Sequence, residues 1–180
     1  MKKFLSHSLF LLLLLSPFEA FATTFQDVPT GDPSSAAIEF AVENNIIDTG
    51  KTTFSPDNTV SRADFFVWTL RSLGFEPNDN EKKEKSRCTD ITDKEILPYF
   101  NKAMKLGALQ VATKNPRCLA KKTVSKVEAL RTVFFLYGIP TPRFSDTQLP
   151  YIDVDSDAWF FPFVEKNVEL NFVEPESSTY

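Results

Sequence analysis

The chain has 180 residues, a net charge of −4 and a single histidine, His7. A mildly acidic chain without a dense basic stripe is a poor candidate for nucleic-acid binding. If His7 is removed with an N-terminal leader, the mature protein has no imidazole, which excludes Ser-His-Asp or Cys-His catalysis and histidine-ligated zinc.

Residues 1–22 have the pattern of a secretory signal peptide. Two lysines precede the apolar run LFLLLLLSPF, and the small-residue triplet AFA follows it. These features predict cleavage after Ala22. The alternative, a membrane anchor, is disfavoured because the apolar run is short and is broken by Ser16 and Pro17. We therefore expect a secreted chain of 158 residues with a net charge of −5.

The rest of the chain repeats itself at intervals of 63 or 64 residues. The tetrapeptide FQDV starts at Phe25, CTDI at Cys88 and YIDV at Tyr151. Likewise, FSPDNTVSRAD at 54–64 returns as CLAKKTVSKVE at 118–128. A fixed period of this kind indicates an array of similar structural units.

The repeats divide the chain into block one (23–87), block two (88–150) and block three (151–180). Block three contains only the first half of the pattern. One block of this size buries its apolar residues poorly, so we expect the copies to share one core. The polar stretch EPNDNEKKEKSR between the first two blocks is typical of a solvated linker.

A complete block is expected to hold two helices. The first lies in AAIEFAVENNII in block one, in ILPYFNKAMKLGAL in block two and in WFFPFVEKNVELNFV in block three. Pro98 and Pro162 suit a first helical turn in the latter two. The second helix is predicted by an apolar periodicity of three and four residues. Gly74 and Gly138 then suit a left-handed C-terminal cap.

Two serine–acid pairs mark where the second helices start. Ser61 precedes Asp64 by three residues, and Ser125 precedes Glu128 by the same distance. Each pair predicts a capping box, in which the hydroxyl accepts a free helix N–H and the carboxylate accepts the backbone N–H of the serine. These patterns together predict an all-α fold.

This order of segments resembles an S-layer homology domain. The signature tetrad of that family, Thr-Arg-Ala-Glu, has its counterparts in Ser-Arg-Ala-Asp at 61–64 and, more loosely, in Ser-Lys-Val-Glu at 125–128. The resemblance implies a pseudo-threefold helical bundle of two helices and a loop per repeat, with an incomplete third repeat. It also implies a bacterial cell-surface protein that needs no cofactor. Such a protein binds a cell-wall polysaccharide, often acidic or pyruvylated, or peptidoglycan.

The resemblance assigns glycan binding to the cation of the tetrad, here Arg62 and Lys126. A cation beside a helix start opposes the helix dipole by about 0.3–1 kcal/mol, whereas free amides plus a cation attract an anion. The alternative is a solvated surface charge. Trp159 and Gly50 complete the expected glycan-binding set, although Trp159 also suits a core position. Trp68, beside the apolar stripe of its helix, is expected to be packed.

Cys88 and Cys118 are the only cysteines, and in an exported protein an even pair favours a disulfide. Cys88 takes the place of Phe25 in the repeat, and Cys118 takes the place of Phe54. We therefore expect these two repeat positions to touch. The disulfide would then replace an aromatic contact.

Two further patterns are weaker. Three aspartates from Asp153 to Asp157 resemble the start of a calcium loop, but Ala158 and Val164 stand where an EF-hand has glycine and glutamate. We therefore expect no metal. A glycosidase needs a carboxylate pair in a setting that shifts a pKa, and no motif here indicates one. We therefore expect no enzymatic activity.

Two other interpretations stay open from the sequence. One is a structural or protein-interaction module with the same fold and no glycan binding. The other is a fragment of a larger surface protein. The incomplete third block also predicts an exposed apolar patch and self-association.

Overall fold

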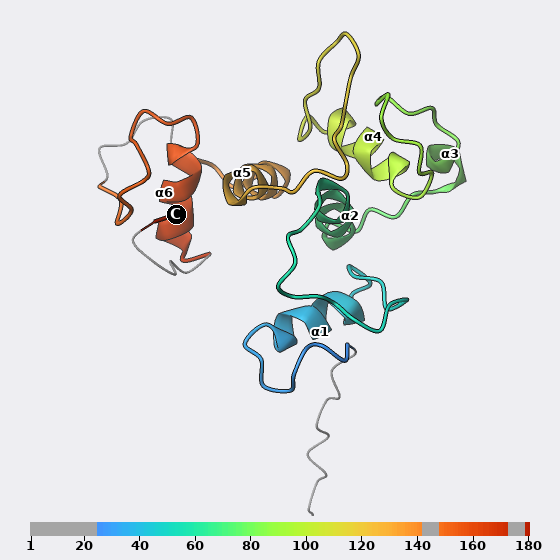
Figure 1. The fold of residues 1–180 in the computed structure, drawn as a ribbon. Helices are drawn as coiled ribbons and strands as arrows, with labels where there is room; N and C mark the ends of the chain where they lie inside the picture. Colours follow the sequence, from blue (N-terminus) through green and yellow to red (C-terminus); the bar gives the residue numbers. More distant parts are fainter. Residues whose placement is uncertain (1–24, 142–147, 173–178) are drawn as a thin grey trace, which may run out of the picture.

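The computed structural model describes residues 25–141, 148–172 and 179–180. Their secondary structure is helical, without a strand in these ranges, which confirms the all-α prediction (Figure 1). The helices are α1 (Ser35–Glu43), α2 (Arg62–Ser72), α3 (Asp79–Lys82), α4 (Leu97–Lys105), α5 (Lys126–Leu136) and α6 (Phe161–Leu170). Of the described helices, none has the length and apolarity needed to cross a membrane. The predicted signal peptide, 1–22, lies outside the described residues.

The starts of α5 and α2 differ in one detail. At α5, the Glu128 N–H donates to Ser125 Oγ at 3.3 Å, and the Ser125 N–H donates to Glu128 Oε2 at 3.1 Å, which is a complete capping box. At α2, the Asp64 N–H donates to Ser61 Oγ at 3.1 Å, but the Asp64 carboxylate accepts the Ser61 hydroxyl at 2.6 Å. Aspartate is one methylene shorter than glutamate, so its carboxylate meets the hydroxyl instead of the backbone N–H.

The first helix is shorter than its apolar run predicts. It ends at Glu43, because Asn45 adopts a left-handed conformation with φ of 56°. Asparagine tolerates this region better than most residues and serves as a helix terminator. The N–H groups of Ile46 and Ile47 then fold back onto the Ala41 carbonyl at 2.7 and 3.2 Å.

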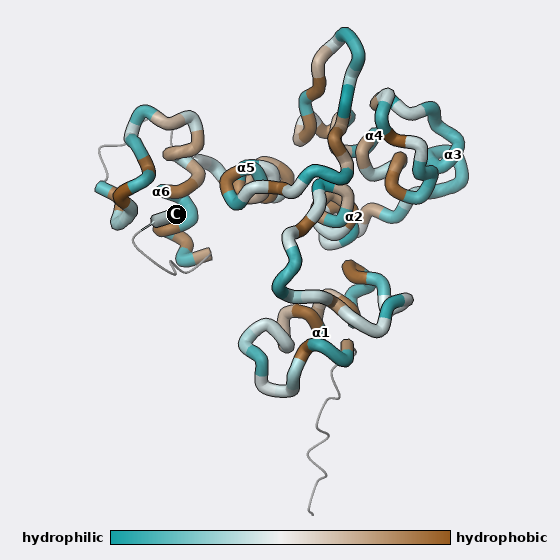
Figure 2. The backbone as a smooth tube through the Cα atoms, viewed as in Figure 1, coloured by the Kyte–Doolittle hydropathy of each residue, from teal (hydrophilic) through white to brown (hydrophobic). Residues whose placement is uncertain are grey.

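The predicted linker between the first two blocks is not wholly irregular. It contains the short helix α3, which starts with a capping box formed by Asn78 and Glu81. The sequence NDNE has the spacing of a capping box. This helix is not predicted from the sequence, because the charged residues around it are typical of a linker. The segment around α3 is hydrophilic, whereas α4 and α5 carry hydrophobic residues (Figure 2).

Helices pack between blocks. The second helix of block one, α2, packs on α4, the first helix of block two, and α5 packs on α6 in the same way. The larger cluster of buried residues contains Phe66 and Leu70 of α2 and Phe100 of α4. A separate small cluster surrounds Phe25 and Ile38. The sequence predicts one core shared by the blocks. Within the described residues the buried side chains form separate cores instead, because each helix–helix interface joins only two neighbouring blocks.

Cys88 and Cys118 form a disulfide, with their Cα atoms 5.6 Å apart. Both are buried in the larger core cluster. The two cysteines are 30 residues apart in the sequence. In the chain-entropy model, closing a loop of this length stabilises the folded state by about 3–4 kcal/mol.

We predict that the Cys88→Ser, Cys118→Ser double variant loses about 3–4 kcal/mol of unfolding free energy, because its unfolded state is no longer constrained. Urea denaturation followed by circular dichroism measures this loss. Wild-type protein in reducing agent should match the double variant. Equal stability of the oxidised wild type and the double variant would contradict the prediction.

Candidate functional site

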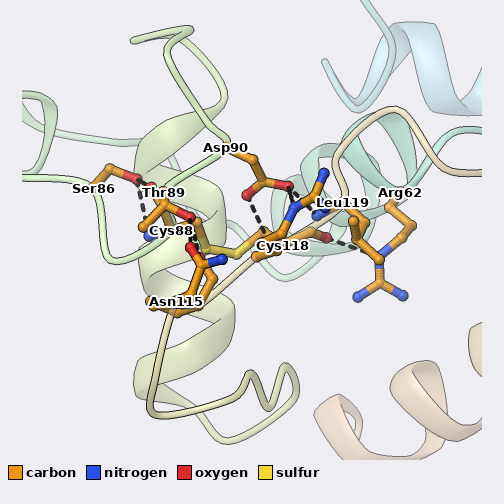
Figure 3. A network of polar contacts seen from close by, with 10 residues as sticks. Arg62, Ser86, Cys88, Thr89, Asp90, Asn115, Cys118 and Leu119 are labelled. Carbon is orange, nitrogen blue, oxygen red and sulfur yellow. Dashed lines mark hydrogen bonds and ion pairs between the residues drawn. A yellow bond between two sulfur atoms is a disulfide. The ribbon is translucent and has the colours of Figure 1, made fainter.

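An aspartate closes the loop of block two. The two Asp90 carboxylate oxygens accept the backbone N–H groups of Cys118 and Leu119 at 2.8 and 2.9 Å (Figure 3). Leu119 has φ of 53°, in the left-handed region. The carboxylate therefore fixes a turn that leucine does not favour by itself.

The same arrangement recurs in block one, and block three shows one bond of the same kind within the described residues. Asp27 accepts the N–H groups of Phe54 and Ser55 at 2.8 and 2.7 Å. Asp153 accepts the Tyr180 N–H at 2.8 Å. These aspartates are the third residue of FQDV, CTDI and YIDV, so the sequence repeat at this position corresponds to a repeated contact. We call each such aspartate with its N–H donors a clamp.

Each clamp is accompanied by a contact between the two ends of its loop. In block two this contact is the disulfide. In block one the rings of Phe25 and Phe54 lie 5.5 Å apart, and in block three those of Tyr151 and Tyr180 lie 4.8 Å apart. The expected contact between these repeat positions is therefore present, and Tyr180 is the block-three equivalent of Phe54.

Arg62 joins block one to the clamp of block two. Its Nε donates to the Cys118 carbonyl at 3.1 Å (Figure 3), and one terminal nitrogen lies 3.7 Å from a Glu128 carboxylate oxygen. Its guanidinium carbon lies 5.8 Å from the centre of the Phe66 ring, and the side chain is 15% exposed. The predicted outward-facing cation is instead turned towards the next block, because a carbonyl and a carboxylate are within reach.

Lys126 makes the equivalent contact one block later. Its Nζ donates to the Tyr180 carbonyl at 2.9 Å and lies 4.7 Å from the centre of that ring. Both cations of the repeated tetrad thus bind the carbonyl of the clamped residue in the following block. We call these two contacts latches.

Backbone bonds reinforce the first latch. The N–H groups of Arg62 and Ala63, at the start of α2, donate to the carbonyls of Lys122 and Ala120 at 2.8 and 2.9 Å. Ser61 and Thr123 form an isolated antiparallel bridge. The free amides on which an anion site at this helix start would depend are therefore partly used within the protein.

Beside this junction lies a cleft of about 690 Å³, which we call the inter-block cleft. One wall is the start of α2, and the other is formed by block two. Its charged lining residues are three carboxylates and three cations, namely Asp64, Asp90, Asp93, Arg117, Lys121 and Lys122. Mixed charge of this kind can accept an acidic group and also hydroxyl donors.

The Asp90 carboxylate at the cleft is held ionised. Burial acts to raise the pKa of Asp90, but the hydrogen bonds from the Cys118 and Leu119 N–H groups outweigh it and lower the pKa. Arg117 Nε lies 3.8 Å from Asp90 while its side chain stays 61% exposed. Its guanidinium is therefore accessible to a ligand.

Comparison with known protein families bears on the first block. The S-layer homology domain matches residues 24–66. The chain carries an S-layer homology domain. Domains of this family are binding modules that anchor proteins to the cell wall, which implies association with the cell surface. No curated protein matches the chain.

The S-layer homology match covers one wall of the cleft. Ser61 and Asp64 lie within it, whereas the cations of the opposite wall follow it in block two. Sequence reasoning missed Arg117, Lys121 and Lys122. The signal for them was the basic character of PRCLAKK around Cys118, which faces the tetrad only once the blocks are paired.

The other expected glycan-binding residues lie apart from this cleft. A Cβ at Gly50 would meet no atom within 4 Å, so no close contact requires glycine there. Trp159 is 58% exposed and contacts Phe160 and Phe163 edge-on. Within the described residues no group of three or more potential metal ligands gathers. Asp153 of the calcium-like sequence instead belongs to the third clamp.

We predict that Arg62→Ala lowers the free energy of unfolding by about 1.5–3 kcal/mol, the usual cost of losing a hydrogen bond made by a charged group. Urea denaturation measures the change. Arg131→Ala is the control, because Arg131 is exposed on α5 and makes no hydrogen bond or ion pair in the described structure. If both variants melt like the wild type, the latch does not stabilise the junction.

We predict that acidification weakens the clamps of blocks one and two, whose aspartates have lowered pKa values. A carboxyl with a folded pKa below its ordinary value of 3.8 contributes stability above that value, and the contribution is lost as pH falls through the folded pKa. Asp90→Asn should therefore be less stable than wild type at pH 7, with a smaller gap at pH 2.5. Asp57→Asn, at an exposed residue, should show no such gap. A gap for Asp90→Asn that is independent of pH would contradict this.

Proposed function

We propose that the protein is exported and anchors non-covalently to a cell-wall polysaccharide through the inter-block cleft. The observation that carries this proposal is the cleft itself. One of its walls belongs to the S-layer homology match, and the opposite wall carries accessible cations. A cavity of about 690 Å³ lies within the range of roughly 300–1,000 Å³ typical of small-ligand sites. No cofactor is needed for such binding.

The charges suggest an acidic glycan. Arg117 and Lys121 are exposed and can bind a carboxylate, such as a pyruvyl group or the acid of a muramic-acid unit in peptidoglycan. Asp64 and Asp93 can accept hydroxyl or amide hydrogens of the same sugar. The phosphates of a nucleic acid would instead meet these carboxylates as like charges, with no hydrogen atom to donate to them.

The residues expected from the family tetrad serve this proposal in a different way. Arg62 and Lys126 bind the loops that follow them, so they support glycan binding by holding the wall of a cleft. Trp159 and Gly50 remain proposed glycan contacts outside the cleft. Exposure of the Trp159 ring is compatible with that role.

A protein-interaction role is the alternative. Block three exposes Ile152 at 82%, Trp159 at 58% and Phe172 at 54%. Exposed apolar residues of this size favour association with another surface, including a second copy of the chain. Light scattering across a concentration series measures self-association directly.

We predict that the Arg117→Ala, Lys121→Ala double variant binds purified cell-wall sacculi about ten- to a hundred-fold more weakly than wild type, because charge-assisted contacts are lost. Co-sedimentation measures the affinity. Lys83→Ala, Lys85→Ala removes the same charge from an exposed segment near α3 and should bind as wild type does.

Two outcomes would count against the proposal. If the double variant sediments like its control, the cleft cations do not contact the glycan. If the wild type itself does not sediment with sacculi, the interaction-module alternative takes the lead.

A further inference from the structure

The helix α2 has two different faces. Phe66 and Leu70 are 3% and 1% exposed and pack in the core with α4. The opposite face carries Asp64, Trp68 and Arg71, whose spacing of four and three residues aligns them along the helix. Asp64 is exposed and Trp68 is half-buried. This face is therefore open to solvent next to the inter-block cleft.

Two more cavities adjoin this face. One of about 430 Å³ lies towards α4 and is lined by Asp64, Trp68 and Arg71, among others. Another of about 350 Å³ lies towards the loop of block one and is lined by Asp64, Trp68 and Phe54, among others. Asp64 also lines the inter-block cleft. The three cavities therefore meet at Asp64, and two of them share Trp68.

The two shared residues have unused binding capacity. One Asp64 carboxylate oxygen accepts the Ser61 hydroxyl at 2.6 Å, and the other has no partner in the described structure. The Trp68 ring stacks beside Phe54, with centroids 6.2 Å apart and planes at 20°, which holds the indole in one orientation. Its N–H makes no hydrogen bond to a described residue. A fixed indole beside a free carboxylate oxygen offers an apolar surface and a polar acceptor together.

A sugar chain fits this combination. The apolar face of a pyranose ring can cover an indole while its hydroxyl groups donate to a carboxylate. Because the cavities share Asp64 in their linings, a ligand could run from one to the next, and such a ligand must be longer than one that fills the cleft. Acidic residues outnumber cations four to two in the lining of the cavity towards α4, although Asp48 and Glu76 pair with Arg71. They disfavour an anionic segment there and favour neutral or amino sugars.

We propose that the Asp64–Trp68 face of α2 is a second binding surface, which carries neutral or amino-sugar units of a wall polysaccharide onward from the inter-block cleft. This inference rests on the proposed glycan-anchoring function. Trp68, which the sequence pattern assigns to packing, is then both a support for the Phe54 ring and a platform for a sugar.

The test uses sacculi digested with muramidase and separated by fragment length. Wild type should bind long fragments more tightly than short ones. Trp68→Leu should lose about three- to ten-fold for long fragments and bind short fragments as wild type does, because Trp68 does not line the inter-block cleft. Asp64→Asn should weaken both, because Asp64 lines the cleft as well as the second surface. Glu43→Gln and Phe40→Leu on α1 are the matched controls, since both side chains are exposed and lie outside these cavities.

A second measurement does not depend on the stability of the variants. Wild type labelled with 5-fluorotryptophan has two ¹⁹F resonances, because the chain has two tryptophans, and the Trp68→Leu spectrum assigns them. The Trp68 resonance should shift when long fragments are added.

The outcomes separate this inference from the function on which it rests. If neither sacculi nor fragments bind wild type, both proposals fail. If fragments bind through the Arg117 and Lys121 cleft, but long fragments leave the Trp68 resonance unmoved and bind Trp68→Leu as tightly as wild type, only the second surface is overturned.

Discussion

A carboxylate that accepts successive backbone N–H groups closes the loop of block two, and the remaining contacts at the junction depend on that closure. Asp90 holds Cys118 and Leu119 in a turn that presents the Cys118 carbonyl to Arg62. Without the clamp, the latch has no fixed acceptor and the cleft has no fixed second wall. Asp27 and Asp153 make similar contacts in the other blocks. The loops held by Asp90 and Asp153 are the ones that Arg62 and Lys126 of the preceding block bind.

The partner of each clamp varies, whereas the clamp itself does not. A disulfide, a phenylalanine pair and a tyrosine pair occupy the same repeat positions. The tyrosine pair carries a cost, because the Tyr151 and Tyr180 hydroxyls are buried and make no hydrogen bond within the part of the chain that the structure describes. Burial, together with the neighbouring Tyr151, raises the pKa of Tyr180 to about 12. Covalent closure lies in block two, beside the inter-block cleft, where a fixed loop would support the proposed binding.

The sequence alone predicts the local features well. Helix starts at Ser61 and Ser125 and the cysteine pairing follow from short-range patterns and from the repeat. The orientation of Arg62 does not, because its partners lie 56 residues or more along the chain and face it only after α2 packs on α4. For the same reason, the sequence did not indicate that Arg117, Lys121 and Lys122 line a cleft. A repeat shows which positions are equivalent, but it does not show that a residue in one block binds the next block.

The arrangement of charge also limits how such a module can bind. The chain is acidic overall, so long-range attraction cannot bring it to an acidic polymer, and screening removes most interaction beyond about 8–10 Å in any case. Binding must then depend on contacts at short range. Arg62 is already engaged within the protein, which leaves the exposed Arg117 and Lys121 to meet an acidic group. With only a few accessible cations in the cleft, a wall anchor would gain strength by extending along its ligand, and the uncharged contacts proposed for Trp68 would supply that length.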